Sequence, residues 1–288
     1  MSAKSLFHGC YVATLTPFDG TDRLDTGAVR AHTQWLLENG TEGFCPAGTT
    51  GEFLYLTAAE KAALIAATVE AAAGRAPVIA GVWALGEAER IFLTKAAHAA
   101  GAAAVFLPAP IYYPANDDAI YAWYAAVHQA SPLPVFAYNI PQYAANTVSI
   151  ACLDRLFAAG IIAGAKDSTG KAERVSELVQ RYGRNAVVFA ASDGFASEGR
   201  RLGADGFISA IANAVPALFA RLWGGDESLQ PEVDRIRTAL KSVGSISALK
   251  YLLERQGFPF GQARIPYSAL TPEQKAMLDP LLKNVGQG

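Results

Sequence analysis

The sequence predicts an α/β protein, specifically a (β/α)₈ TIM barrel with a C-terminal helical extension. Short apolar runs typical of parallel strands alternate with segments of helical periodicity, and eight such cycles fit into about 225 residues. A doubly wound open sheet is the alternative, but it would normally carry a GxGxxG turn after its first strand, and "TPFDGTD" is not one. After "WGGDES" only helical patterns follow. We therefore predict a barrel over residues 1–225 and an extension over residues 226–288 that packs against it.

The first four strands are predicted from apolar runs that are each followed by a helical segment. In order, these runs are "CYVATLTPF", "TEGFCPAGTTGEF", "PVIAGVW" and "AAAVFLPAP". The first helix is expected from about Asp25, and Thr57 with Glu60 forms a capping box at the start of the second. The segment "EAERIFLTKAAHAAG" and a helix from about Asp117 to Gln129 complete the third and fourth cycles.

The last four strands are predicted from "LPVFAYNIP", "IIAGAK", "AVVFAASD" and "ADGFISAIAN", each followed by a helix-like segment. In the sixth strand, residues 161–165 form a buried run and Lys166 follows at its carboxyl end. The extension contains three predicted helices, of which the last is the capped segment "TPEQKAMLDPLLK". The first two are marked by apolar residues at helical spacing: Val233, Ile236 and Leu240, then Ile246, Leu249, Leu252 and Leu253.

Composition excludes several classes of protein. Only 17% of the 288 residues are charged, without long same-sign runs, so no nucleic-acid surface is expected. No apolar stretch approaches the length of a membrane span, and the N-terminus lacks a signal-peptide core. Three scattered cysteines, Cys10, Cys45 and Cys152, fit a reducing cytoplasm rather than a disulfide framework. The four histidines form no HxH or HExxH pattern, so no metal site is expected.

Lys166 is the first candidate catalytic residue. In such barrels the chemistry lies where the strands end and the loops begin. Lys166 ends strand six and therefore shares this face with Tyr138, Thr49, Thr50 and Asp193. A buried lysine is costly unless it is paired or neutral, and a partly neutral lysine is a nucleophile. Judged on the local stretch "GAKDSTG" alone, an ion pair with the next residue, an aspartate, or an exposed loop is an equally good interpretation.

These residue types suit Schiff-base chemistry with a ketone or an aldehyde. Tyr138, on the neighbouring strand, is the available acid–base group, because no histidine falls at a strand end. Thr49 and Thr50 lie between two glycines, which allow backbone N–H groups to approach a carboxylate closely. An ordinary turn is the alternative for "GTTGE", and aromatic packing is the alternative for the tyrosines after strand four.

The motifs "GTTGEF", "YNIP", "GAKDSTG" and "GADGFISAIAN", in this order and spacing, resemble the dihydrodipicolinate synthase / N-acetylneuraminate lyase family over essentially the whole chain. The resemblance implies a class I, pyruvate-type lyase or aldolase on a TIM barrel, without a cofactor and commonly tetrameric. It implies that Lys166 is the Schiff-base lysine and that Tyr138 and Thr49 form the proton relay. It further implies that Thr50 helps to hold the pyruvoyl carboxylate, and that Tyr113 reaches into the neighbouring subunit's site.

Substrate preference is where the chain departs from the family pattern. Members that make dihydrodipicolinate carry an arginine two residues after the proline of "YN-x-P", where it binds a substrate carboxylate; here Tyr143 takes that place. Ser168 matches a position where sugar-acid lyases carry a hydroxyl, and Asp193 is placed to hold a substrate hydroxyl. Ile208 matches a strand-eight position near the keto acid. These matches favour pyruvate with a hydroxylated aldehyde as partners.

Four functional hypotheses follow. The leading one is an enzyme that cleaves, condenses or dehydrates a hydroxylated 2-keto acid through an imine at Lys166. Dihydrodipicolinate synthase proper is the alternative within the same chemistry. A metal-dependent barrel lyase would need a cluster of His, Asp and Glu at the strand ends, which the sequence lacks there. A non-catalytic keto-acid-binding relative would be expected to have lost Lys166 or Tyr138, and both are present.

Overall fold

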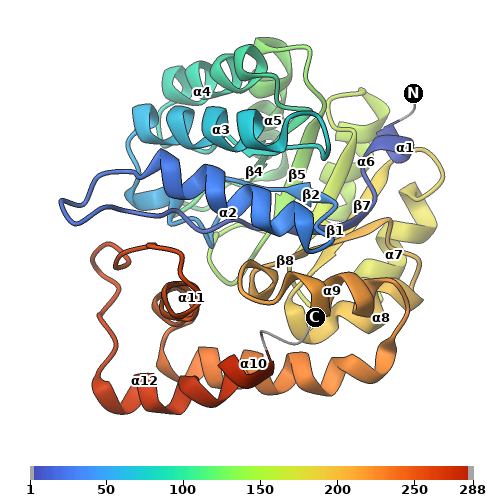
Figure 1. The fold of residues 1–288 in the computed structure, drawn as a ribbon. Helices are drawn as coiled ribbons and strands as arrows, with labels where there is room; N and C mark the ends of the chain where they lie inside the picture. Colours follow the sequence, from blue (N-terminus) through green and yellow to red (C-terminus); the bar gives the residue numbers. More distant parts are fainter. Residues whose placement is uncertain (1–2, 285–288) are drawn as a thin grey trace.

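The computed structural model describes residues 3–284, and its strands form a parallel barrel (Figure 1). The strands pair in the order β2-β1-β8-β7-β6-β5-β4-β3, and a parallel bridge between Phe44 and Val78 joins the two ends of this series. The predicted (β/α)₈ barrel is therefore confirmed. The strands are β1 (Gly9–Val12), β2 (Gly43–Phe44), β3 (Ile79–Gly81), β4 (Ala104–Pro108), β5 (Val135–Asn139), β6 (Gly164–Asp167), β7 (Val187–Ala191) and β8 (Gly206–Ser209).

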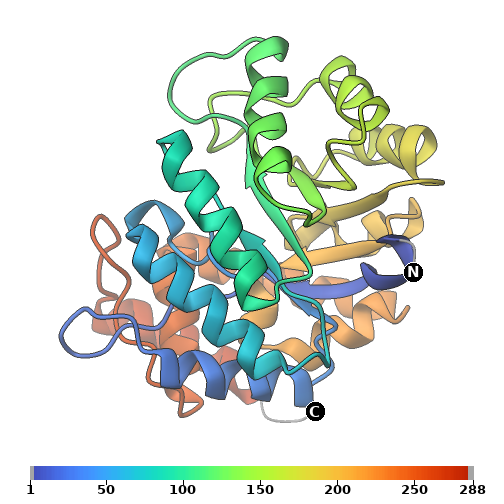
Figure 2. The ribbon, with the colours of Figure 1, turned by 90° about the horizontal axis from the view of Figure 1, so that it is seen from above.

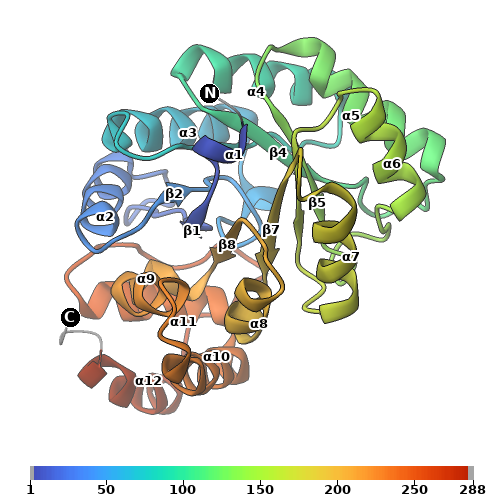
Figure 3. The ribbon, with the colours of Figure 1, turned by 90° about the vertical axis from the view of Figure 1, so that its right-hand side faces the viewer.

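Helices cover the outside of the barrel. Figure 3 shows α2 to α9 in chain order around the strands, and Figure 2 shows α2, α3, α4 and α5 side by side. The predicted capping box of Thr57 and Glu60 begins α3. The barrel helices are α2 (Thr26–Glu38), α3 (Ala58–Ala72), α4 (Glu87–Ala100), α5 (Asp117–Ala130), α6 (Ile150–Ala158), α7 (Ala172–Tyr182), α8 (Ala196–Arg201) and α9 (Pro216–Trp223). A short helix that the sequence did not predict, α1 (Ala3–Leu6), precedes β1.

The sixth strand is placed differently from its prediction. It begins at Gly164 and includes Lys166, whereas the apolar residues Ile161 and Ile162 precede it. The reason is the pairing with β5 and β7, which runs from Gly164 to Asp167 and so includes Lys166. The neighbouring strands approach closely here: a Cβ at Gly164 would lie 2.5 Å from both the Val187 carbonyl oxygen and the Phe136 ring, so only glycine fits at this point. Lys166 is therefore held in the ladder rather than in the loop that follows.

The interior of the barrel below the site is filled by aromatic rings. Side chains alternate along a strand, so Phe136 and Tyr138 of β5 point to the same side. The ring of Phe136 lies 5.1 Å from that of Phe7 and 5.8 Å from that of Phe189, and Phe189 packs edge-on against Tyr11 at 4.9 Å. These buried rings pack in one cluster with Tyr138 and restrict the movement of its side chain.

The chain after α9 forms α10 (Gln230–Val243), α11 (Ser245–Arg255) and α12 (Pro272–Leu278), which lie together below the barrel in Figure 1. The buried residues Val233, Ile236 and Leu240 of α10 belong to one hydrophobic cluster with Val12 and Phe207 of the barrel. The division into residues 1–225 and 226–288 stays a prediction, and residues 1–2 and 285–288 of those ranges lie outside the described part. Within residues 3–284, no helix is long and apolar enough to cross a membrane.

Candidate active site

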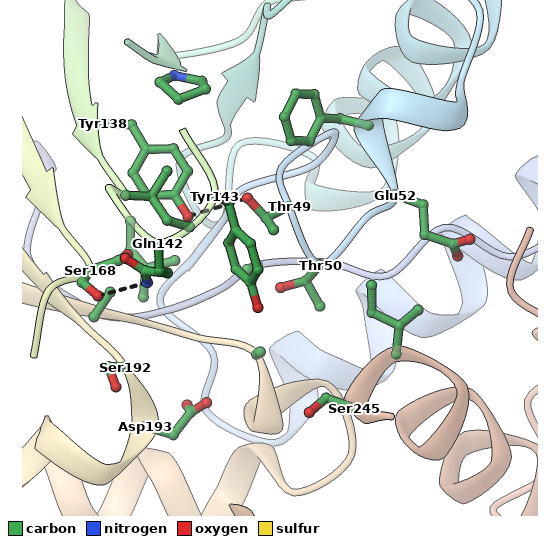
Figure 4. Close-up of a pocket in the computed structure, with 18 of the residues that line it drawn as sticks. Thr49, Thr50, Glu52, Tyr138, Gln142, Tyr143, Ser168, Ser192, Asp193 and Ser245 are labelled. Carbon is green, nitrogen blue, oxygen red and sulfur yellow. Dashed lines mark hydrogen bonds between the residues drawn. The ribbon is translucent and has the colours of Figure 1, made fainter. Parts of the chain in front are cut away.

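A cavity of about 740 Å³ opens where the strands end. Strand-end loops form one wall, and α10 and α11 of the extension form the opposite wall. Figure 4 shows polar side chains from both walls directed toward it. All the predicted site residues except Tyr113 line this cavity: Thr49, Thr50, Tyr138, Tyr143, Lys166, Ser168, Asp193 and Ile208.

Lys166 lies in an aromatic environment. It is 6% exposed and stands opposite Tyr138 on β5 and Phe189 on β7. Its Nζ atom is 4.0 Å from the centre of the Tyr138 ring and 5.7 Å from that of Phe106. In the described part of the chain, no carboxylate lies within ion-pair distance of Nζ. Burial raises the pKa of the neighbouring Cys45 thiol to about 12, and the charge of Lys166 opposes that rise.

Asp167 does not pair with Lys166, because its side chain points away from the barrel interior. Its carboxylate accepts hydrogen bonds from Asn139 Nδ2 at 2.8 Å and from the Thr169 backbone N–H at 2.9 Å, and it pairs with Arg174 at 3.4 Å. The local interpretation of "GAKDSTG" as an ion pair or an exposed loop is therefore wrong. Alternation along β6 sends the aspartate outward and the lysine into the cavity.

Tyr138 and Thr49 form a hydroxyl pair beside Lys166. The two oxygen atoms are 3.3 Å apart, and Tyr138 is only 3% exposed (Figure 4). The phenol ring packs against both the lysine and Phe106, whose ring centre is 5.7 Å away. Two hydroxyl groups at this distance beside an amine are compatible with the predicted acid–base relay, which stays a prediction.

The loop that carries Thr49 and Thr50 is held close to the first strand's loop. A Cβ at Gly51 would lie 2.8 Å from the Thr14 carbonyl oxygen, and the Gly51 carbonyl oxygen accepts a hydrogen bond from Thr16 Oγ1 at 2.7 Å. Glycine at this position therefore allows the two loops to approach closely, and this contact fixes the position of the loop that carries both threonines.

Ser168, Gln142 and Tyr143 form the wall next to β5 and β6. Gln142 Nε2 donates to the Ser168 carbonyl oxygen at 3.0 Å, and the Ser168 backbone N–H donates to the Asn139 carbonyl oxygen at 2.9 Å (Figure 4). Tyr143 is 69% exposed and stands at the rim of the cavity. It offers a phenol to the cavity, where the family pattern for dihydrodipicolinate synthesis has an arginine side chain.

Asp193 lines the cavity at the end of β7. Ser209 Oγ donates to one of its carboxylate oxygens at 2.5 Å. Burial raises the pKa of Asp193, while hydrogen bonds from Ser209 and the Ile211 backbone and the charge of Arg237 oppose the rise. Ile208, on the adjacent strand β8, is 5% exposed. The carboxylate is thus already engaged by hydrogen bonds within the protein, and the role of Asp193 toward a substrate stays a prediction.

Tyr113 lies apart from the cavity of its own chain. It is on the loop between β4 and α5, is 75% exposed, and packs edge-on against Tyr112 at 4.9 Å. Its position does not contradict a role in a neighbouring subunit's site, which stays a prediction.

Several residues of the cavity were not predicted. Arg237 and Lys241 are one helical turn apart on α10, so they share a face, but nothing in the sequence connects that face with the strand ends. Ser192 lies at φ +79°, a conformation that non-glycine residues rarely adopt and that often marks functional sites. Within residues 3–284, no group of three His, Cys, Asp or Glu side chains could hold a metal ion.

The fold and the cavity together are those of a (β/α)₈ barrel enzyme with its site at the carboxyl ends of the strands. The sequence matches the Dihydrodipicolinate synthetase family over residues 6–285, and the chain belongs to that family. The predicted resemblance is confirmed, as is the prediction of a class I, pyruvate-dependent lyase at the level of the family.

Individual relatives agree along nearly the whole chain. A 4-hydroxy-tetrahydrodipicolinate synthase of Methylobacterium radiotolerans is 34% identical over 291 residues, which cover 98% of this chain and 97% of the relative. A dihydrodipicolinate synthase structure from Bacillus anthracis is 28% identical with a TM-score of 0.91, covering 98% of this chain and 99% of that one. A sialic acid aldolase structure from Ruminococcus gnavus is 21% identical with a TM-score of 0.95, covering 99% and 97%, and supports the fold alone.

Proposed function

We propose that the protein forms an imine between Lys166 and the carbonyl of pyruvate or a related 2-keto acid, and that it cleaves, condenses or dehydrates a hydroxylated 2-keto acid of the 2-keto-3-deoxy sugar acid type. The observation that carries the proposal is a lysine that is 6% exposed, lines the cavity and lacks a carboxylate partner in the described chain. A lysine amine at the floor of a cavity, beside two hydroxyl groups, is placed to attack the carbonyl carbon of a bound keto acid.

The reaction in the cleavage direction uses the residues around Lys166 in order. The amine attacks the ketone carbon, and the carbinolamine loses water to give an iminium ion. A base takes the proton of the hydroxyl group on the second carbon from the iminium carbon. The bond between this hydroxyl-bearing carbon and the carbon next to the iminium then breaks. The hydroxyl-bearing carbon leaves as an aldehyde, and the electron pair of the broken bond forms an enamine. The enamine carbon takes a proton, and water then releases pyruvate. Tyr138 and Thr49 would carry these protons, because their oxygen atoms are 3.3 Å apart beside Nζ. Thr50 would hold the carboxylate.

The proposed substrate class depends on the polar residues that line the cavity around the lysine. Tyr143 stands two residues after the proline of "YN-x-P". An arginine would be needed at this position to bind a second carboxylate of the substrate, and a phenol cannot form that ion pair. Ser168 and Asp193 line the cavity and offer partners for substrate hydroxyls. A polar, hydroxylated chain fits these groups better than a chain that ends in a charged group.

A second candidate function is dihydrodipicolinate synthesis. Two observations favour it: curated relatives at 34–36% identity carry the name 4-hydroxy-tetrahydrodipicolinate synthase, and Arg237 and Lys241 of α10 line the cavity. Either cation could bind a carboxylate in place of the missing arginine. The two candidates share the imine at Lys166 and differ only in the aldehyde.

Borohydride trapping tests the imine. Treatment with pyruvate and borohydride should inactivate the protein and add one reduced pyruvate to Lys166, as found by intact mass and peptide mapping over a panel of 2-keto acids. Lys61 and Lys250 are internal controls, because they are as buried as Lys166 but donate hydrogen bonds to backbone carbonyl oxygens. An unmodified protein, or an adduct on one of these two, would rule out the mechanism.

We also propose that the active form is a homo-oligomer, at least a dimer and by family resemblance a tetramer, in the cytoplasm. Tyr112 and Tyr113 are 77% and 75% exposed, which is a large apolar area for a single loop. Tyr113 would complete a neighbour's site, so activity should disappear as the protein is diluted into monomers. Sedimentation velocity beside activity over the same dilution series checks this. A fully active monomer at assay concentration contradicts it.

A further inference from the structure

A buried ion pair connects the extension with the loop that carries Thr49 and Thr50. Lys250 Nζ of α11 lies 2.6 Å from Glu52 Oε1, and the two side chains are 2% and 0% exposed. Glu52 immediately follows Gly51, and its backbone N–H donates to the Thr49 carbonyl oxygen at 3.2 Å. The carboxylate is thus attached to the turn that sets the position of both threonines.

Further contacts hold the pair from the side of the extension. The Arg264 backbone N–H donates to Glu52 Oε2 at 2.7 Å, and Lys250 Nζ donates to the Gln262 carbonyl oxygen at 3.2 Å. The Phe18 ring lies 4.2 Å from both the Lys250 Nζ atom and the Arg264 guanidinium carbon. We call Glu52, Lys250 and Arg264 the Glu52 clamp. Each carboxylate oxygen of Glu52 therefore has a partner in the extension.

Stability alone does not account for this arrangement. Desolvation of two charges offsets much of their attraction, and well-packed apolar residues in place of a buried pair are often as stable. Burial lowers the pKa of Lys250, and the charge of Glu52 opposes that change. In addition, Glu52 has a φ of +59°, in the left-handed region that non-glycine residues disfavour. A charged pair on a strained turn fixes one loop geometry, which an apolar contact does not.

We propose that Lys250 is a positioning residue that acts through Glu52, so that the C-terminal extension sets the catalytic geometry of Thr49 and Thr50 instead of only covering the barrel. The inference rests on the function proposed for those two threonines. Glu52 lines the cavity but is held by Lys250, so it acts on the substrate only through the loop.

Lys250→Met is the decisive variant, and Lys61→Met is its matched control. Lys61 is also buried, at 3% exposed, and donates to the Trp83 carbonyl oxygen at 3.0 Å, outside the cavity. Lys250→Met should raise KM for pyruvate and lower kcat/KM by about 10²-fold, the usual cost of a misplaced catalytic group. Lys61→Met should lower Tm and leave KM within about threefold, because a loss of stability changes the active fraction and leaves KM unchanged. Equal, small effects of both variants on kcat/KM would overturn the proposal.

A double variant adds a second signature. In Lys250→Met the Glu52 carboxylate is buried without the ammonium group that it pairs with in the wild type, which should lower Tm. The double variant Glu52→Gln/Lys250→Met buries no charge, so it should recover Tm while kcat/KM stays low. Recovery of wild-type kcat/KM in the double variant overturns the proposal. If Lys250→Met does not fold, the double variant replaces it in the kinetic test.

Hydrogen exchange of the Thr49–Glu52 amides separates this proposal from the proposed function. Exchange there should accelerate in Lys250→Met and stay at the wild-type rate in Lys61→Met. If wild-type protein forms no borohydride adduct at Lys166, the proposed chemistry fails, whereas exchange still reports whether the clamp holds the loop. Unchanged exchange in Lys250→Met means that the clamp does not position the loop.

Discussion

Tyr138→Phe is expected to lower kcat by about 10²–10⁴-fold, the usual contribution of a general acid–base group. The substitution keeps the ring that packs against Phe106 and lies 4.0 Å from Lys166 Nζ, and it removes only the hydroxyl that faces Thr49. Imine formation at Lys166 should persist at a reduced rate, because the amine itself is untouched. Steady-state kinetics, together with the rate of borohydride trapping, measures both effects.

Tyr182→Phe is the matched control for this prediction. Tyr182 is buried on α7, and its hydroxyl donates to an Asp154 carboxylate oxygen at 2.7 Å, outside the cavity. Its loss should reduce the free energy of unfolding by about 0.5–1.5 kcal/mol, the typical net value of a hydrogen bond, with kcat near wild type. If Tyr138→Phe keeps its turnover within about tenfold, the tyrosine is structural and the proposed proton route is wrong.

Hydroxylated aldehydes are expected to be better partners for pyruvate than aspartate semialdehyde. Loss of a charge-assisted pair to a carboxylate costs on the order of 2–5 kcal/mol, which corresponds to a factor of tens to thousands in rate. Tyr143 cannot make that pair, whereas Ser168 and Asp193 line the cavity and are proposed to bind hydroxyls. The measurement is kcat/KM for aspartate semialdehyde against several aldoses and hydroxyaldehydes, all with pyruvate.

Variants of Arg237 and Lys241, the two cationic residues of α10 that line the cavity, would explain a preference for aspartate semialdehyde. If aspartate semialdehyde wins clearly, the argument from Tyr143 fails and the second candidate function stands. Arg237→Gln and Lys241→Gln then show whether these side chains replace the missing arginine, since their loss should lower kcat/KM for the charged aldehyde and spare neutral ones. Both residues lie on α10, in the wall across the cavity from the strand ends that carry Lys166, so trapping with pyruvate alone should persist in both variants.

The sequence by itself determined the barrel and the face on which the candidate site lies. Alternating strand and helix patterns predict parallel strands, and parallel strands of a barrel all end at one face. Residues at those ends, such as Lys166, Tyr138 and Thr49, could therefore be grouped from the sequence alone. The strand boundaries could not be predicted, because pairing with the neighbouring strands sets them. For example, β6 begins at Gly164, where only glycine fits between the flanking strands.

Only the tertiary structure decided which groups lie around each buried charge. Lys61, Lys166 and Lys250 are all buried, yet Lys61 donates to the Trp83 carbonyl oxygen, Lys250 pairs with Glu52, and Lys166 faces the cavity without a carboxylate in the described chain. The extension likewise supplies a wall of the cavity, although its sequence shows only amphipathic helices. The physical reason is that an ion pair depends on distance in space, and helix and strand periodicity specify only which face of an element a residue occupies.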